Sequence, residues 1–440
     1  MERNNILVAK FGGSSLADAR QFKKVRDIVI SDSRRRYVVP SAPGKRDSKD
    51  IKVTDLLYTC YCHTNNQEKF ERLFLQIKKR YNDIIRSLKL DISLEKEFEE
   101  IKRAFINQIG EAYAASRGEY LNGILLAHYL GFDFVDASEV IRFEENGAFN
   151  DEETNILLKQ RLSRVDNAVV PGFYGATASG KIYTFSRGGS DITGALVARA
   201  VGALKYENWT DVPGFLITDP SIVRKPKKID IMTFAELREL SYRGASVLHE
   251  DAVYPARREG IPIHIRNTND PNGSGTLICQ DVDPKDIGPI TGIAGKRNFV
   301  AINFAKNNMN SQAKYYKRLL DVLDRFNINS EHMPSGIDTI SIILPRAEYL
   351  FQKDALLLAI DDALHPDSIS IDDDMAMVTV VGKGMRSVSG IATKFFSALG
   401  DADVNIKMID MGSNEMNCSI GISNADFEKA IKALYNRLAK

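Results

Sequence analysis

Short apolar runs alternate with charged, amphipathic stretches from the start of the chain to about residue 280. Residues 6–11 and 37–41 are runs of strand length, and the second contains the first proline. Five later runs have the same character and occupy residues 132–137, 168–173, 182–185, 215–219 and 261–266. Strands that are apolar throughout are typical of a parallel sheet buried on both faces. The pattern therefore predicts an α/β domain with one mostly parallel sheet.

Charged residues dominate between positions 67 and 108, where apolar positions recur at helical spacing. This pattern predicts a pair of amphipathic surface helices. The earlier segment 41–50, SAPGKRDSKD, is polar and contains both Pro and Gly. That composition predicts a loop directly after the second strand.

The pattern changes over residues 281–292, where the sequence DVDPKDIGPITG is loop-like. We place a domain boundary there, which gives one domain at 1–288 and a second region at 289–440.

The second region contains one order of elements twice: a strand, a helix, a strand after an Asn-Ile pair, and a further strand. The two pairs are Asn327-Ile328 and Asn405-Ile406. Two diverged copies of a βαβ-type module, at about 293–365 and 374–440, account for the repeat. The copies either follow one another or interleave, and a chance likeness of two α/β segments is the alternative.

Composition narrows the class of protein. A chain of 440 residues with 44% hydrophobic and 27% charged positions is typical of a globular protein with several domains. Lys and Arg number 59 against 58 Asp and Glu, so the net charge of +1 indicates neither a nucleic-acid nor a membrane partner. No apolar run reaches the roughly 18 residues that span a bilayer, and the polar start MERNN is unlike a secretory signal. We therefore predict a cytoplasmic protein.

The cysteines and histidines indicate no metal centre. Four cysteines in a chain of this length do not form a disulfide framework, and the Cys60-x-Cys62 pair has no second pair to complete a metal site. We interpret the cysteines as reduced structural thiols. His249 and His264 are interpreted as core histidines, and no metal ligand is predicted.

The first strand ends at Lys10 and runs directly into the sequence Gly-Gly-Ser-Ser. Gly12 and Gly13 leave the backbone N–H groups open to an anion, and the lysine supplies a point charge for phosphate oxygens. The lysine precedes the glycines, so the turn is not a P-loop. Taken alone, the turn is weak evidence, and a plain strand-to-helix connection is the favoured interpretation.

A second glycine-rich turn, FSRGGSD at residues 185–191, follows the apolar run IYTF and opens a helical segment. The N-terminus of that helix is a favourable place for an anion. Arg187 suits a bidentate contact with a carboxylate or phosphate, and Asp191 is either a helix cap or a site residue. Two such turns, one with Lys and one with Arg, favour a phosphate site, because positioned cations and N–H donors carry most of phosphoryl-transfer catalysis.

Two further features have both a chemical and a structural interpretation. The segment WTDVPGFLITDP contains the only Trp, and Trp209 or Phe215 either stacks on a base or belongs to the core, the second being favoured. Glu119 lies beside Arg117, and without further information the two form a solvated ion pair.

In this order the motifs resemble those of an aspartate kinase of the amino-acid kinase family. The resemblance rests on KFGGSSLAD, SRGE, FSRGGSD, WTDVPGFLITDP, ELSYRGASVLH and NTNDPNGSGTLI, and it covers nearly the whole chain. The tandem tail, with VGKGM at 381–385, resembles a pair of ACT domains. The resemblance implies a mostly parallel sheet sandwiched by helices, followed by two ferredoxin-like ACT modules.

The resemblance also implies an activity and a set of site residues. Aspartate kinases transfer the γ-phosphoryl group of MgATP to the side-chain carboxylate of L-aspartate, a first step toward lysine, threonine and methionine, so ATP and Mg²⁺ are expected. The implied catalytic residues are Lys10, Asp191 and Arg187. The implied aspartate ligands are Ser41, Thr54, Glu119 and Arg187. The implied nucleotide contacts are Lys10, Gly12, Gly13, Ser14, Thr210, Asp211 and Asp219.

Paired ACT domains imply feedback inhibition by an amino acid, with lysine the first expectation and threonine the second, and a homodimer or a tetramer built from it. The implied effector contacts, for which ordinary module surface is the alternative, are Met309, Gln312, Asn329, Ser330, Glu331, Asp338 and Thr339.

The chain departs from the family pattern on the nucleotide side. Ser246 stands where a lysine is common, and Glu250 replaces a proline. Ser221 stands where an arginine is common. Arg243 and Arg224 are candidates to compensate for these changes.

Two other functions stay open from the sequence. One is an amino-acid kinase for glutamate, acetylglutamate or a nucleotide, against which the tandem tail and the SRGE stretch argue. The other is a non-catalytic amino-acid sensor, which the departures at Ser246 and Ser221 motivate. The retained residues oppose it, and they are Lys10, Glu119, Arg187 and Asp191.

Overall fold

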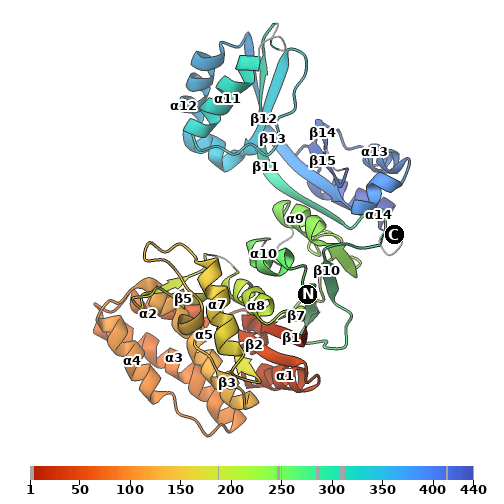
Figure 1. The fold of residues 1–440 in the computed structure, drawn as a ribbon. Helices are drawn as coiled ribbons and strands as arrows, with labels where there is room; N and C mark the ends of the chain where they lie inside the picture. The colour runs from red at the N-terminus through yellow and green to blue at the C-terminus, as the bar shows by residue number, and fades with distance from the viewer. Residues whose placement is uncertain are drawn as a thin grey trace. The chain divides into compact units, whose positions relative to one another are not determined.

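The structure, a computed structural model, describes residues 4–186, 188–244, 248, 250–283, 288–307, 309, 313–412 and 415–439. The chain forms two compact units (Figure 1). The first unit comprises Met1–Phe215, Lys228–Leu237 and Ser246–Val282, and the second comprises Leu216–Lys227, Arg238–Ala245 and Asp283–Lys440. Two short segments thus pack with the second unit although they precede it in the sequence. The predicted boundary at 288/289 stays a prediction.

The described part of the first unit is built on an eight-stranded sheet in the order β3-β4-β2-β1-β7-β9-β10-β8. Neighbouring strands are parallel except for β9 and β10, which are antiparallel. The mostly parallel sheet predicted from the apolar runs is therefore confirmed. The strands are β1 (Asn4–Phe11), β2 (Arg35–Pro40), β3 (Asp133–Phe134), β4 (Ala168–Val169), β7 (Ala203–Thr210), β8 (Ile231–Thr233), β9 (Ile263–Asn267) and β10 (Thr276–Cys279).

Two of the predicted strands do not join this sheet. The run at 182–185 forms β6 (Ile182–Thr184), which pairs antiparallel with β5 (Tyr174–Ala176) in a separate small sheet. The fully described run 215–219 contains none of the named strands. Its backbone bonds elsewhere: the N–H of Phe215 donates to Thr276 Oγ1, and that of Ile217 donates to the carbonyl of Lys227. Apolar character alone does not choose the hydrogen-bond partner of a strand, and here nearby loops supply it.

Helices cover both faces of the sheet, and the predicted pair between 67 and 108 forms α3 and α4. Helices α2, α3, α4 and α5 gather on one side of the unit (Figure 1). The helices that lie wholly in this unit or run through it are α1 (Ala19–Ile30), α2 (Val53–Tyr61), α3 (Gln67–Leu88), α4 (Glu95–Ile106), α5 (Glu111–Leu130), α6 (Ala137–Val140), α7 (Asp151–Leu162), α8 (Gly189–Ala200), α9 (Phe234–Tyr242) and α10 (Glu250–Arg258).

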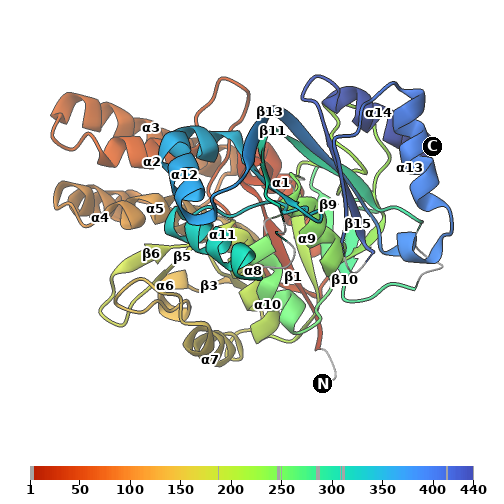
Figure 2. The same ribbon diagram turned by 90° about the horizontal axis from the view of Figure 1, so that it is seen from above.

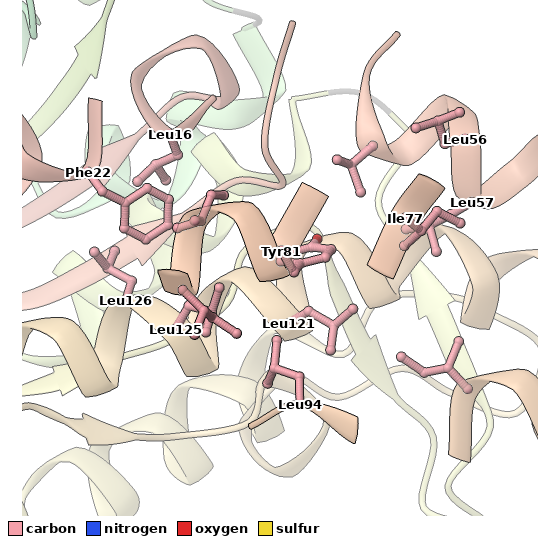
Figure 3. Packing of buried hydrophobic residues seen from close by; sticks show 14 of the residues in the cluster. Leu16, Phe22, Leu56, Leu57, Ile77, Tyr81, Leu94, Leu121, Leu125 and Leu126 are labelled. Carbon is pink, nitrogen blue, oxygen red and sulfur yellow. The ribbon is translucent and has the colours of Figure 1, made fainter. Parts of the chain in front are cut away.

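Helix α3 shows why the local sequence forms these elements. The side chain of Asn66 accepts a hydrogen bond from the N–H of Lys69 and caps the first turn. Phe70, Phe74, Ile77 and Tyr81 are then buried at three- and four-residue spacing. Figure 3 shows the resulting core, in which side chains of α3 and α5 lie among leucines of α2 and of the turn that follows β1.

The side chains of β1 alternate between two environments. Ala9 and Phe11 belong to the apolar core that also contains Phe22 of α1 and Leu125 of α5. Lys10 points to the opposite face, where it meets the first turn of α8. A single strand therefore anchors the core with one set of residues and presents a cation with the other.

The described part of the second unit is built on a five-stranded antiparallel sheet in the order β12-β11-β13-β15-β14. Figure 2 shows the long strands β11 and β13 running through it, with α11 and α12 near one end and α13 and α14 near the other. The elements are β11 (Gly292–Ala305), α11 (Ala313–Arg325), β12 (Thr339–Pro345), α12 (Arg346–Leu364), β13 (Ser368–Val381), α13 (Ile391–Asp401), β14 (Met408–Met411), β15 (Asn417–Ile422) and α14 (Phe427–Leu438).

The two long strands serve two cores. Ile293 at the start of β11 packs with Phe395 of α13, whereas Phe304 near its end packs with Leu319 of α11. The repeat of elements is present, with one exception: the strand predicted after Asn327-Ile328 is reduced to an isolated bridge between His332 and Ile343. Asn327 adopts a left-handed conformation with φ of 53°, which ends α11 in a tight turn rather than leading into a strand.

Candidate functional site

Three adjacent parallel strands bring their following loops to one edge of the first unit. In the order β2-β1-β7, the strands end at Pro40, Phe11 and Thr210. Ligands of α/β proteins bind at this carboxyl edge, where loops meet that are distant in the sequence. The glycine turn after Phe11, the loop after Pro40 and the end of β7 are therefore neighbours.

Lys10 is held by an ion pair on the α8 face of the sheet. Its side chain lies 2.5 Å from Asp191 Oδ1, measured from Nζ, and the residue is only 7% exposed. Asn208 donates a hydrogen bond of 2.8 Å from Nδ2 to the same oxygen. Lys10 and Asn208 stand opposite each other in the pairing of β1 with β7, so the strand register itself brings both side chains to Asp191. The ammonium is thus fixed in place at the end of the strand.

Of the two glycines after Phe11, the second is required by close approach, and the first keeps the space beside Lys10 open. A side chain at Gly12 would place its Cβ 3.8 Å from Lys10 Nζ, in the space beside the ammonium. A Cβ at Gly13 would lie 2.8 Å from the carbonyl oxygen of Ala42. The N–H of Gly44 donates to the carbonyl of Gly13 at 2.8 Å. The glycine turn therefore lies directly against the loop that follows β2.

Glu119 of α5 is a buried carboxylate at the other side of that loop. It is 6% exposed, and its Oε2 has no hydrogen-bond partner among the described residues. Burial raises the pKa of Glu119 to about 7, although the backbone N–H of Ala42 donates to it and partly opposes the shift. An unpaired buried acceptor of this kind is suited to a cationic ligand group.

The remaining predicted aspartate ligands lie at the two ends of the loop after β2. Ser41 is half-buried, and its carbonyl oxygen accepts a hydrogen bond of 2.6 Å from Asn122 Nδ2 on α5. Thr54 is half-buried in the first turn of α2. Arg187 lies outside the described residues.

The predicted nucleotide contacts belong to different units of the structure. Thr210 ends β7, next to the glycine turn, since Gly12 donates its N–H to the carbonyl of Trp209. Thr210 Oγ1 donates to Asp211 at 3.2 Å, and Asp211 is exposed. Asp219 belongs to the second unit, where its carboxylate accepts the N–H of Ser221 in a local turn. Thr210 and Asp211 therefore lie at the strand end beside the Lys10 turn, and the role of Asp219 stays a prediction.

The burial of three side chains decides between the chemical and the structural interpretations that the sequence left open. Trp209 is 1% exposed and stacks on Phe11, so it is a core residue and not a platform for a base. Phe215 is equally buried. The solvated ion pair of Arg117 with Glu119 is wrong: the guanidinium of Arg117 is buried, lies over three tyrosine rings and donates to Ser116. Residues two apart on a helix point in different directions.

Two site residues were not identified from the sequence. Asn208 holds Asp191, and Asn122 holds the backbone of Ser41. The alternation along β7 places Asn208 on the face opposite Trp209, and Asn122 follows Glu119 by one helical turn. These two patterns identify Asn208 and Asn122 as site residues only once the neighbouring strand and the facing loop are known.

The predicted effector residues fall into two groups in the second unit. The N–H of Met309 donates to Asp338 Oδ1 at 3.2 Å, and Thr339 follows directly at the start of β12. Glu331 instead accepts a hydrogen bond from Tyr242 at the end of α9. Asn329 is exposed and Ser330 half-buried after α11, while Gln312 lies outside the described residues.

The compensating arginines are placed in the second unit. Arg243 donates to His332 at 2.8 Å and stacks on Tyr242, so its guanidinium is engaged there. Arg224 is exposed. Ser246 and His249 lie outside the described residues, and His264 is half-buried and bonds the carbonyl of Ser274.

The described helices include none with the length and apolar character needed to cross a membrane. Cys60, Cys62 and Cys418 are free thiols.

The sequence and the fold match known proteins over nearly their whole length. The amino acid kinase family profile matches residues 5–267, and an ACT domain profile matches residues 378–438. Aspartokinase 3 of Bacillus subtilis is 38% identical to this chain over 97% of both. The crystal structure of Clostridium acetobutylicum aspartate kinase, described as an allosteric enzyme, superposes with a TM-score of 0.91 at 46% identity, covering 98% of this chain and all of that one.

Escherichia coli aspartokinase III has been solved in two states that also match. Its complex with aspartate and ADP gives a TM-score of 0.77 at 26% identity, and its complex with lysine and aspartate gives 0.73 at 27%. Both cover 99% of this chain and 100% of theirs.

Proposed function

Because the chain belongs to the aspartokinase family, we propose that it is an ATP-dependent aspartate kinase that forms 4-phospho-L-aspartate for the synthesis of lysine, threonine and methionine. The observation that carries this proposal is the ammonium of Lys10, fixed by Asp191 and Asn208 beside an open glycine turn. Phosphoryl transfer depends chiefly on positioned positive charge, and this arrangement supplies it.

The glycine turn fits the phosphates of ATP. The space beside Lys10 Nζ is one that any side chain at Gly12 would enter, so the bare backbone leaves room for an anion next to the ammonium. Gly13 and Ser14 continue this turn, and Thr210 and Asp211 lie at the neighbouring strand end. Mg²⁺ bound to the phosphates would add charge neutralisation when ATP is present.

The buried carboxylate of Glu119 fits the ammonium group of aspartate. Its Oε2 lacks a partner and its pKa is raised to about 7 by burial, so a cation beside it would be strongly favoured. Ser41 and Thr54 would contact the substrate from the two ends of the intervening loop. Arg187 would bind the α-carboxylate through its planar fork.

The reaction needs no general base. The attacking carboxylate oxygen of aspartate is already ionised at neutral pH. It forms the new bond to the γ-phosphorus as the bond from that phosphorus to the ADP oxygen breaks. Lys10 stabilises the charge on the transferring group, while Asp191 keeps the ammonium oriented.

The second unit supplies regulation in this proposal. Lysine is the first candidate effector and threonine the second, with Met309, Asp338 and Thr339 as one group of contacts and Glu331 as another. We further propose a cytoplasmic homodimer that pairs through its ACT domains, with a tetramer as the alternative.

The test of the activity is an acyl-phosphate trap. Hydroxylamine converts 4-phospho-aspartate to a hydroxamate, so aspartate with MgATP should give both hydroxamate and ADP, and glutamate should give neither. Equal product from glutamate or acetylglutamate would assign a different amino-acid kinase. Ligand-dependent stabilisation by aspartate without any ADP would assign a sensor instead.

A further inference from the structure

The loop between β2 and α2 begins with Ser41, and Thr54 lies in the first turn of α2 directly after it, so the loop joins two of the proposed aspartate ligands. Its sequence is polar and contains three lysines, an arginine and a glycine, and it would be mobile without an anchor. Several groups outside the loop hold it in place, and one of them is a buried cation. This cation is Arg80, in the middle of α3.

Arg80 is a buried cation whose guanidinium spans the loop. Its Nη1 donates to Asp50 Oδ2 at 2.6 Å and to the carbonyl of Ile51 at 3.3 Å. Its Nη2 donates to the carbonyl of Gly44 at 2.7 Å and to that of Ala17 at 3.4 Å. The residue is 5% exposed. A charged group buried this deeply persists only when its donors are satisfied, and here the loop accepts three of the four hydrogen bonds that the two Nη atoms donate.

Asp50 joins the same cluster from within the loop. Arg46 donates to it from Nε and Nη2, at 2.8 and 2.9 Å. These hydrogen bonds, together with the charge of Arg80, hold the pKa of Asp50 well below its usual range. The Asp50 carboxylate therefore links two parts of the molecule, because it binds Arg46 within the loop and Arg80 on helix α3.

Contacts connect Arg80 both to the glycine turn after β1 and to Glu119. Gly44, whose carbonyl Arg80 holds, donates its N–H to Gly13 and leaves no space for a Cβ, which would lie 2.6 Å from the Gly13 carbonyl carbon. Two residues before Gly44, the N–H of Ala42 donates to the Glu119 carboxylate. Displacement of Gly44 would thus move the groups that set the position of Glu119 and Ser41.

We propose that Arg80 is a positioning residue for aspartate binding, acting through the loop at residues 41–52 without touching the substrate. The inference rests on the proposed kinase function. Loss of Arg80 should weaken the binding of aspartate more than that of ATP. Three of its four hydrogen bonds hold the loop, and only the longest one reaches Ala17, next to the glycine turn.

The test compares Arg80→Met with Arg86→Met. Arg86 lies on the same helix, but its side chain is exposed and bonds Asp83 and the carbonyl of Asn82 within that helix, so it is a matched control. We expect Arg80→Met to raise the KM for aspartate about tenfold or more, since small misplacements of a binding group have effects of that size. The KM for ATP should change less than about threefold, and Arg86→Met should leave both constants unchanged.

Chemical rescue separates positioning from folding. Two cavities of about 290 and 270 Å³ border Arg80 and provide a path for a small cation. Methylguanidinium should therefore restore aspartate affinity to Arg80→Ala while leaving Arg86→Ala unaffected. Arg80→Lys should bind aspartate with intermediate affinity, because one ammonium cannot span the same carbonyl groups.

Aspartate binding is also measured without turnover, by the shift of Tm that aspartate produces. If the wild type binds aspartate but forms no ADP, the kinase proposal fails and the inference is still tested by this shift. An unchanged aspartate KM in Arg80→Met, a loss confined to kcat, or failure of Arg80→Met, Arg80→Ala and Arg80→Lys alike to fold would overturn the positioning role. A wild type that neither binds nor phosphorylates aspartate would overturn both.

Discussion

The phosphate half and the aspartate half of the site are prepared in opposite ways. In the phosphate half, the charge of Lys10 is already compensated by Asp191, which Asn208 also holds. In the aspartate half, Glu119 is buried with an unpaired oxygen and a pKa of about 7. In the phosphate half the charges of Lys10 and Asp191 are already paired, whereas in the aspartate half the Glu119 carboxylate gains a charged partner only when a ligand binds. The difference suggests that rate depends on the first half and affinity for aspartate on the second.

The largest effect should come from Lys10→Ala. Removing the cation that faces the transferring phosphate should lower kcat by roughly 10²–10³-fold, the size found when one preorganised donor is lost. The KM for aspartate should change little, because the lysine lies in the phosphate half. Steady-state ADP release measures both constants, and far-UV circular dichroism should show an intact fold. A kcat close to that of the wild type would remove Lys10 from the mechanism.

Glu119→Gln should act on affinity instead. A neutral amide cannot compensate the substrate ammonium, and losing one partner of a buried charge pair should raise the KM for aspartate by roughly 30-fold or more. The expected fall in kcat is much smaller. Titration of initial rates against aspartate at saturating ATP measures the split. A lower kcat at constant KM would contradict the division into two halves.

The pH dependence of aspartate binding should follow Glu119. Its pKa in the unliganded fold lies above the ordinary value of 4.5, so the carboxyl is protonated below about pH 7 and cannot pair with the ammonium. The KM for aspartate should therefore rise by about tenfold per pH unit below 7 and level off above it. The Glu119→Gln variant is the control, and its KM should be flat over the same range.

The same shift predicts a change in stability. Between about pH 4.5 and 7 the folded protein holds a proton that the unfolded chain has lost, so the unliganded protein should lose stability as pH rises through this window. Thermal unfolding of the wild type and of Glu119→Gln, compared over that range, isolates the contribution of this residue. An identical pH profile for the two proteins would contradict the raised pKa.

Asn208→Ala should give the smallest effect. It removes one of two groups that hold Asp191, while the Lys10 ion pair stays in place. We expect kcat to fall by roughly five- to tenfold, as for the loss of one hydrogen bond to a charged group, with the aspartate KM unchanged. Rate measurements at saturating substrates give the comparison, and an aspartate KM that rises with the fall in kcat would show that the halves are coupled.

Local sequence was sufficient for the elements and for the residues that carry charge. The apolar run before Lys10 forms β1, the amphipathic pattern after Asn66 forms α3, and the resemblance named Lys10, Asp191 and Glu119. Prediction from local sequence failed where an apolar run could pair with more than one strand or loop. The run at 215–219 found hydrogen bonds in loops, and the run at 182–185 paired in a small separate sheet, because local character does not encode which strand will be adjacent.

The sequence by itself thus determined the parallel sheet, the class of the protein and the types of residue available for its chemistry. Only the tertiary structure decided that Asn208 stands in register with Lys10, that Glu119 Oε2 has no hydrogen-bond partner in the described part of the chain, and that Arg80 holds the loop after β2. Each of these depends on strand register, burial or contact between segments far apart in the chain. Those quantities arise when the chain packs, and a local pattern carries no information about them.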